Sequence, residues 1–202
     1  MTQTVSSITD DEIWLLSYYA ASELAGGLLF GKLARWTAES DLRARLTWHC
    51  AEETRHAWAW TETILDLGAA PILVRETYQS EYLREVGLPR SEVDLLAMTQ
   101  VFELRVAHHF AAHLRCPDVR PRVVLTLRQM IQDEGLHLGW VRERLRRWSV
   151  EGSAEDLSRA LARFAAVDRR VYERQIARFR ARPGLQSLGL VLAAQLEDRN
   201  GV

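Results

Sequence analysis

Two copies of one short motif carry the residues most capable of chemistry in this sequence. A Glu is followed three positions later by a His at Glu53 and His56, and again at Glu134 and His137. On a helix, residues three apart lie on neighbouring points of one face, so both side chains of a pair can reach one metal ion. With 17 Glu and 6 His in the chain, chance predicts only about 0.5 such pairs. The repetition therefore indicates a metal site.

A further Glu precedes each motif by about the length of one bundle helix. Thirty residues separate Glu23 from Glu53, and 31 separate Glu103 from Glu134. Four carboxylates on core faces would be very costly to bury without cations, so the alternative to a metal site is a solvated helix face. We predict that six side chains bind two metal ions: Glu23, Glu53, His56, Glu103, Glu134 and His137.

The two halves of the chain resemble each other beyond these ligands. Residues Ile13–Phe30 align with Val93–Phe110 at an offset of 80 positions, and the Glu-x-x-His motifs align at an offset of 81. A duplicated helix pair is the simplest explanation. Each copy would supply one carboxylate from its first helix and a carboxylate plus an imidazole from its second.

This ligand order resembles that of the ferritin-like di-iron carboxylate proteins, whose bundles carry one Glu on each of two helices and Glu-x-x-His on each of the other two. The resemblance covers roughly Thr9–Trp148. Glu52-Glu53-Thr54-Arg55-His56 is similar to the acidic-Glu-x-Arg-His signature of oxygen-activating members, whereas the second copy has Leu136 in place of the Arg. The resemblance implies an all-α, ferritin-like four-helix bundle with one long crossover, in which Glu53 and Glu134 bridge the two ions.

Capping and breaker residues place the helices within this scheme. About 20 residues from Pro71 to Arg90 should form the crossover, and the bundle should occupy residues 1–150. Residues 151–202 should form a C-terminal helical extension packed on it. The expected helices span about 9–36, 40–67, 91–114, 121–150 and 154–180, with a short last helix after Pro183-Gly184.

Composition limits the remaining classes of protein. The chain has 202 residues, 48% of them hydrophobic, which suits one bundle core, and no apolar run is expected to span a membrane. The net charge of -1 argues against a nucleic-acid binder. Cys50 and Cys116 are too few for a disulfide framework or a four-thiolate iron site. We expect a cytoplasmic monomer or homodimer.

Several residues near the ligands have two interpretations. Glu52 and Asp133 either accept hydrogen bonds from metal-bound histidines or are surface charges. His49 is an added ligand, a proton carrier or a hydrogen-bonded core histidine. Tyr19, with Trp60, either carries electrons or belongs to the core.

Small residues and basic residues are likewise open to two interpretations. Gly26, Gly27 and Ala107 either leave a substrate pocket or allow close helix packing. The cluster of His108, His109 and His113 is expected at the surface or an interface. Twelve arginines between Arg142 and Arg182 form either a solvated helical face or a docking surface, whose partner would be an acidic electron donor, an anionic substrate or RNA.

The ligand types favour iron, with manganese as the alternative, because carboxylates bridge cations and imidazole suits later first-row metals. Two ferrous ions can each give one electron to dioxygen. We therefore expect a di-iron oxidase or monooxygenase that acts on a small organic substrate with an external electron donor protein. No catalytic residue beyond the metal ligands is predicted. The alternatives are a ferroxidase or peroxide-reducing iron-handling protein, and a structural bundle with a vestigial site.

Overall fold

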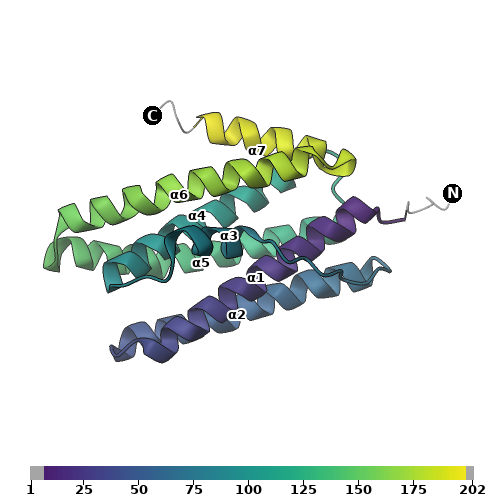
Figure 1. Cartoon of the computed structure of the whole chain (residues 1–202). Coiled ribbons are helices and arrows are strands. Elements are labelled where there is room, and N and C mark those ends of the chain that lie inside the picture. Colours follow the sequence, from purple (N-terminus) through teal and green to yellow (C-terminus); the bar gives the residue numbers. More distant parts are fainter. Residues whose placement is uncertain (1–6, 199–202) are drawn as a thin grey trace. The chain divides into compact units, whose positions relative to one another are not determined.

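The structure is a computed structural model that describes residues 7–198 (Figure 1). All regular structure among these residues is helical, which confirms the all-α prediction. The elements are α1 (Asp10–Trp36), α2 (Ser40–Asp66), α3 (Tyr78–Val86), α4 (Glu92–Leu114), α5 (Pro121–Glu151), α6 (Ala154–Arg180), the 3-10 turn η1 (Pro183–Leu185) and α7 (Gln186–Asp198).

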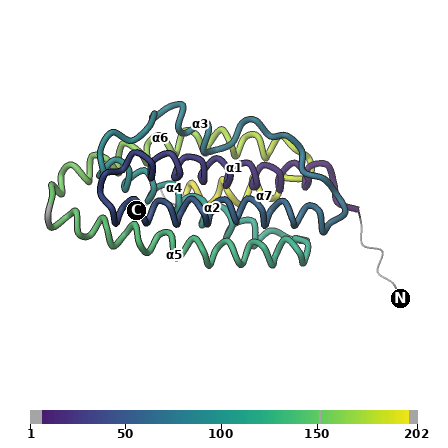
Figure 2. Tube along the Cα trace, turned by 90° about the horizontal axis from the view of Figure 1, so that it is seen from below, coloured from purple at the N-terminus to yellow at the C-terminus, as the bar shows by residue number. Residues whose placement is uncertain are grey.

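The helices group into two compact units. The first comprises α1, α2 and η1, and the second comprises α3 to α7. In the first unit α1 packs along α2 (Figure 2). In the second, α4 packs against α5, α6 and α7, and α6 also contacts α3, α5 and α7. A bundle over residues 1–150 with residues 151–202 as an extension stays a prediction, as does the assembly of the two helix pairs into a ferritin-like bundle.

Local residues explain where α1 and α2 begin and where α2 ends. The Thr9 side chain accepts a hydrogen bond from the backbone N–H of Glu12, whose own carboxylate accepts from the backbone N–H of Thr9. This capping box satisfies two donors that the first turn leaves without partners. The Glu39 carboxylate caps the first turn of α2, where it accepts hydrogen bonds from backbone N–H groups. Gly68, with a φ of 78°, follows α2 in the left-handed region that glycine adopts without strain.

Gly26 and Gly27 allow α1 and α2 to approach each other closely. A Cβ atom on Gly27 would lie 2.9 Å from Thr54 Oγ1 and 3.3 Å from the backbone oxygen of Cys50. On Gly26 it would lie 2.9 Å from Glu53 Oε2. Atoms of α2 therefore fill the space that the missing side chains leave, which favours close packing over an open pocket beside these two glycines. Ala107 is half-buried on α4, and its part in a pocket stays a prediction.

The crossover contains a helix that the sequence did not predict. Helix α3 follows α2 and precedes α4 in the chain, within the segment predicted to form the crossover (Figure 1). Tyr78 and Tyr82 are one turn apart and bury their rings against Phe102 of α4, with ring centroids 5.3 Å and 4.6 Å from it. The buried Glu81 carboxylate accepts hydrogen bonds from Gln175 and Arg178 of α6. These contacts with distant residues stabilise a helix too short to persist alone.

Many of the arginines in the last third form ion pairs within the chain. Arg170 and Arg174 of α6 contact Glu85 of α3, and Arg163 lies 2.6 Å from Asp94 of α4. Ion pairs at this degree of exposure each contribute little to stability. They nevertheless give part of the basic face an intramolecular role, while its role as a docking surface stays a prediction.

Helix α1 corrects the expectation that no apolar run reaches the length of a membrane span. Among the described residues it is the one helix with the required length and composition, because an 18-residue window has a mean hydropathy of 1.2. However, 61% of that window is buried inside the protein. A core helix of a globular protein meets the same criterion, so the apolar character of α1 is explained by its packing against α2 and is weak evidence for a membrane.

Replacing Gly27 tests the close packing of α1 on α2. We expect Gly27→Leu to lower the free energy of unfolding by about 2 kcal/mol or more, because the added side chain would overpack the helix contact. Gly139 of α5 is the matched control, since a Cβ atom added there would meet no neighbouring atom within 4 Å. Gly139→Leu should leave the stability unchanged or raise it by up to about 1 kcal/mol. Urea unfolding of the metal-free proteins measures both, and equal stability of the two variants would contradict this account of the helix contact.

Candidate metal centre

The first unit brings together three of the six predicted ligands. Glu23 projects from α1, and Glu53 and His56 project from neighbouring turns of α2. One ligand atom of each lies within 4.8 Å of the others, and all three side chains are buried. His56 Nδ1 is 4.0 Å from Glu23 Oε2. The absence of a side chain at Gly26 leaves room for the Glu53 carboxylate at this point.

The second unit holds the corresponding residues in a similar arrangement. Glu103 projects from α4, and Glu134 and His137 project from α5. His137 Nδ1 lies 3.4 Å from Glu103 Oε2 and 3.3 Å from Glu134 Oε2. Glu134 and His137 have no solvent-exposed surface. Each unit therefore carries a buried triad of two carboxylates and one imidazole, as the internal repeat predicts.

The chemistry of these triads fits a metal ion. Two carboxylates that share a buried site repel each other and are poorly solvated. A cation would offset both costs, and the imidazole supplies a neutral nitrogen donor. Carboxylate and imidazole together are ligands typical of first-row transition metals. These buried clusters of Glu and His could thus hold a metal ion.

The two acidic residues that precede the ligands lie in different surroundings. Glu52 is half-buried and accepts a hydrogen bond of 2.6 Å from Arg55, and one of its oxygens lies within 4.8 Å of a His56 nitrogen. Asp133 is buried and accepts hydrogen bonds of 2.9 and 3.0 Å from Gln129. Their role as acceptors for metal-bound histidines stays a prediction.

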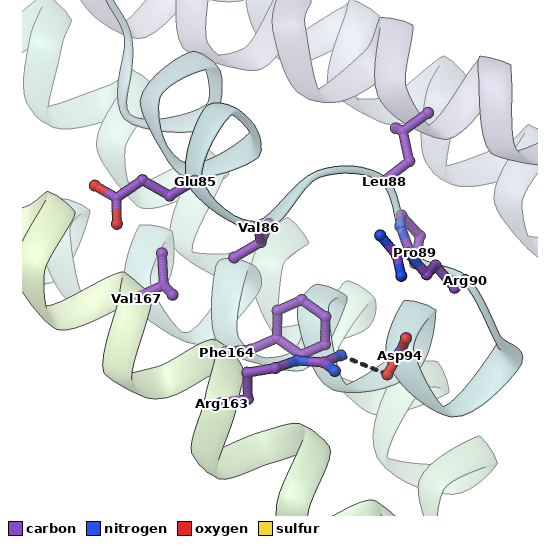
Figure 3. A pocket seen from close by; sticks show the side chains of 9 residues that line it. All are labelled: Glu85, Val86, Leu88, Pro89, Arg90, Asp94, Arg163, Phe164 and Val167. Atoms are coloured by element: carbon purple, nitrogen blue, oxygen red, sulfur yellow. Dashed lines mark hydrogen bonds and ion pairs between the residues drawn. The ribbon is translucent and has the colours of Figure 1, made fainter.

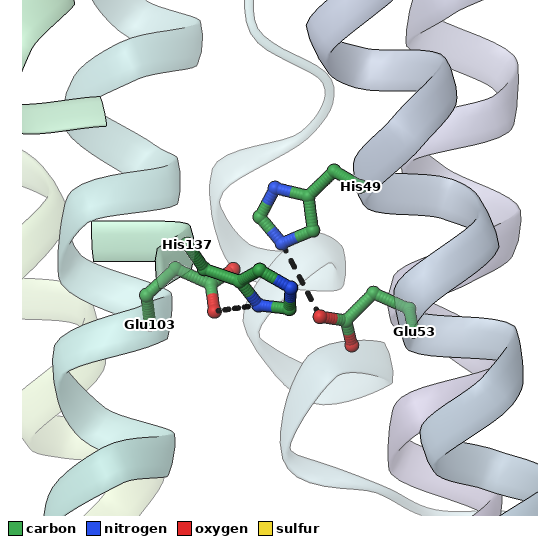
Figure 4. Close-up of side chains that lie close together, drawn as sticks. All are labelled: His49, Glu53, Glu103 and His137. Atoms are coloured by element: carbon green, nitrogen blue, oxygen red, sulfur yellow. Dashed lines mark ion pairs between the residues drawn. The ribbon is translucent and has the colours of Figure 1, made fainter. Parts of the chain in front are cut away.

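His49 lies against a predicted ligand. Its Nε2 is 3.2 Å from Glu53 Oε1, and its ring stacks on Phe30 with centroids 3.9 Å apart. Figure 4 shows this ion pair on α2, and also the pair formed by Glu103 and His137 in the second unit. His49, one turn before Glu53, is thus a second buried nitrogen ligand candidate in the first unit, beside His56.

Tyr19 is part of an aromatic pair. It is buried on α1, and its ring centroid lies 4.9 Å from that of Trp60 on α2. This packing agrees with the interpretation of both rings as core residues. Electron transfer through them stays a prediction.

A cavity in the second unit lies between the α3–α4 connection and α6 (Figure 3). Its volume is about 300 Å³, and its lining contains none of the predicted site residues. Within the lining, the Arg163 guanidinium lies over the Phe164 ring, 4.6 Å from the ring centroid, and forms an ion pair with Asp94. The lining residues are Glu85, Val86, Leu88, Pro89, Arg90, Asp94, Arg163, Phe164 and Val167.

A buried ion pair in the second unit was not predicted from the sequence. Arg105 of α4 donates two hydrogen bonds to Asp168 of α6, through Nε at 2.9 Å and Nη2 at 2.5 Å. Tyr78 of α3 donates a third at 2.6 Å, and burial, with the Asp168 charge next, holds the pKa of Tyr78 well above its usual value. The available signal was a charged residue at a core position of each of the two helices, α4 and α6. This signal does not pair Arg105 with Asp168, because the two residues are 63 positions apart in the sequence.

Two of the clustered histidines are buried, which contradicts the surface position expected for them, while the alternative of an interface stays a prediction. His109 and His113 are less than a tenth exposed, whereas His108 is half-buried. His109 Nδ1 lies 2.8 Å from the Tyr172 hydroxyl of α6. Burial lowers the pKa of His109 to about 3, and the nearby His113 and Arg105 charges act in the same direction. The packing of α6 against α4 covers a histidine that a single-helix projection placed outside.

Comparison of the chain with protein-family models, curated proteins and solved structures finds no match. The function is therefore inferred from the side chains and their arrangement.

The buried His109 should make stability depend on pH. In the unfolded chain a histidine titrates near 6.5, whereas the folded pKa is about 3. Between these values the unfolded state binds a proton that the folded state does not, so stability falls as the pH falls through this window, by at most about 1.4 kcal/mol per unit. We expect His109→Gln to flatten this decline in urea unfolding. Tyr172→Phe should retain most of it, because burial is the main cause, and parallel pH profiles for His109→Gln and the parent would refute the assignment.

Proposed function

We propose that this protein is a non-haem di-iron oxidoreductase of the ferritin-like class, which uses dioxygen to oxidise or hydroxylate a small organic substrate. The observation that carries the proposal is the duplicated triad, since each unit buries two carboxylates and one imidazole. The Glu-x-x-His spacing and the Glu52–His56 segment support the same class. A chance arrangement of surface charges would not bury the same set of two Glu and one His twice.

The proposed ligand roles follow the resemblance to the ferritin-like di-iron carboxylate proteins. His56 and His137 would each bind one ion, Glu53 and Glu134 would bridge, and Glu23 and Glu103 would be terminal ligands. Four ionised carboxylates balance the charge of two divalent cations, so a neutral centre could be buried with neutral imidazoles. Iron bound there would supply two electrons to dioxygen, one from each ferrous ion. Manganese would satisfy the same donors.

The surrounding residues would orient the ligands and keep water away. Glu52 and Asp133 would accept the remaining N–H of a metal-bound histidine, which fixes its ring. The buried Tyr19 and Trp60 rings would exclude water on the side of the first triad. An external electron donor protein would restore the ferrous state, and a cytoplasmic monomer or homodimer suits this reaction.

Iron handling is the second candidate function. Close packing at Gly26 and Gly27 removes one argument for an organic pocket beside Glu53. A ferroxidase or a peroxide-reducing protein needs access only for iron and a small oxidant. The same triads would serve it, because the first steps of both functions need two ferrous ions and buried carboxylates.

Metal analysis tests the triads directly. We expect two iron ions per chain after anaerobic ferrous loading. Glu53→Ala and Glu134→Ala should each remove most of this binding, because each carboxylate would bridge both ions. The exposed Glu143 pairs with Arg146 and Arg147 on the surface, so Glu143→Ala should retain two ions. Unchanged iron content in both bridging variants would remove the basis of the proposal.

Rapid mixing of the ferrous protein with dioxygen separates the two candidate functions. An oxygenase or oxidase should convert one member of a panel of small organic compounds in an amount stoichiometric with the bound iron pairs. Glu134→Ala should abolish this product. Oxidation of added ferrous iron or consumption of peroxide over many turnovers, without any organic product, would assign the protein to iron handling instead.

A further inference from the structure

The two triads differ at one buried neighbouring position. At the offset of 81 that aligns the Glu-x-x-His motifs, His49 of the first copy corresponds to Met130 of the second. Both side chains are fully buried. An imidazole binds first-row divalent metals, whereas a thioether is a soft ligand that favours other ions. The repeat therefore contains an additional nitrogen donor in one copy only.

The geometry of the first unit directs this donor at a ligand carboxylate. His49 lies one turn before Glu53 on α2, with Nε2 3.2 Å from Oε1. The other oxygen, Oε2, points to the side of Gly26, where a Cβ would lie 2.9 Å away. The two oxygens of the proposed bridge thus have different surroundings, because one faces an imidazole and the other faces the backbone of α1.

The His49 ring is held in place by its packing. It stacks on Phe30 of α1 at an interplanar angle of 19°, and it has no exposed surface. A buried imidazole with a fixed ring loses little conformational freedom when it binds a metal ion. The arrangement favours a ligand over a mobile proton carrier.

We propose that His49 is a seventh metal ligand, which makes the two metal positions unequal. The inference rests on the proposed di-metal function and adds an order of loading to it. The ion that Glu53 binds through Oε1 gains a second imidazole, so this position has the higher affinity and fills first. The other position receives the repeated carboxylate and imidazole ligands without an added nitrogen, and it fills second.

Anaerobic titration with cobalt(II) tests the order of loading. Binding of cobalt(II) requires no oxidant. Calorimetry and the visible absorption of the bound cobalt(II) both report the binding. The parent should bind two ions in separate steps, the first at least about tenfold tighter than the second. His49→Met, which copies the residue of the second half, should remove the tighter step and change the absorption of the first ion bound. Met130→His should raise the affinity of the weaker step.

His49→Gln distinguishes a ligand from a positioning residue. The Gln amide can donate a hydrogen bond to Glu53 but is a poor ligand for cobalt(II). If His49 binds the ion, this variant should lose the tighter step as His49→Met does, whereas recovery of that step in His49→Gln would overturn the inference. Far-ultraviolet circular dichroism confirms that the variants fold, and His108→Gln should keep both steps.

The outcomes separate this inference from the function on which it rests. A parent that binds two ions with equal affinity, unaffected by His49→Met, would overturn the seventh ligand and leave the di-metal proposal intact. A parent that binds no cobalt or iron would refute the di-metal function itself.

Discussion

Burial of carboxylates within helix pairs is the constraint on which the rest of this structure depends. Glu23 and Glu53 in one unit, and Glu103 and Glu134 in the other, are nearly inaccessible to solvent. The cost of burying such charges together is large unless cations or hydrogen-bond donors compensate. The helices must therefore place an imidazole beside each carboxylate pair and leave room for the acidic groups. Gly26 provides that room for Glu53, since any larger residue would meet its carboxylate.

The two units meet this constraint with the same residues but support them differently. In the first, a closely packed pair of long helices holds the triad, and the glycines of α1 set the helix contact. In the second, α4 and α5 carry the triad while α3, α6 and α7 pack around them. The buried Arg105–Asp168 pair fixes α4 against α6, and the arginines of α6 hold α3. The two units thus carry the same triad of side chains in different surroundings.

Local signals predicted most of the helical structure. Helices capped by Thr9, Ser91 and Ser153 begin within a residue of the predicted positions, and α6 spans the predicted residues. The Glu-x-x-His spacing also predicted which Glu and His α2 and α5 each bring together, because residues three apart share a helical face whatever the helix packs against. Signals of this kind act over a few residues, so they can be read without knowledge of distant contacts.

The sequence by itself determined the boundaries of the long helices, the internal repeat and the residue types of both triads. Tertiary structure decided the features that depend on distant partners: helix α3 forms because Tyr78 and Tyr82 pack on Phe102, and His109 is buried because α6 covers it. It also decided that α2 fills the space beside Gly27. The physical reason is that burial belongs to a contact between elements, whereas a helical pattern specifies only which residues share a face.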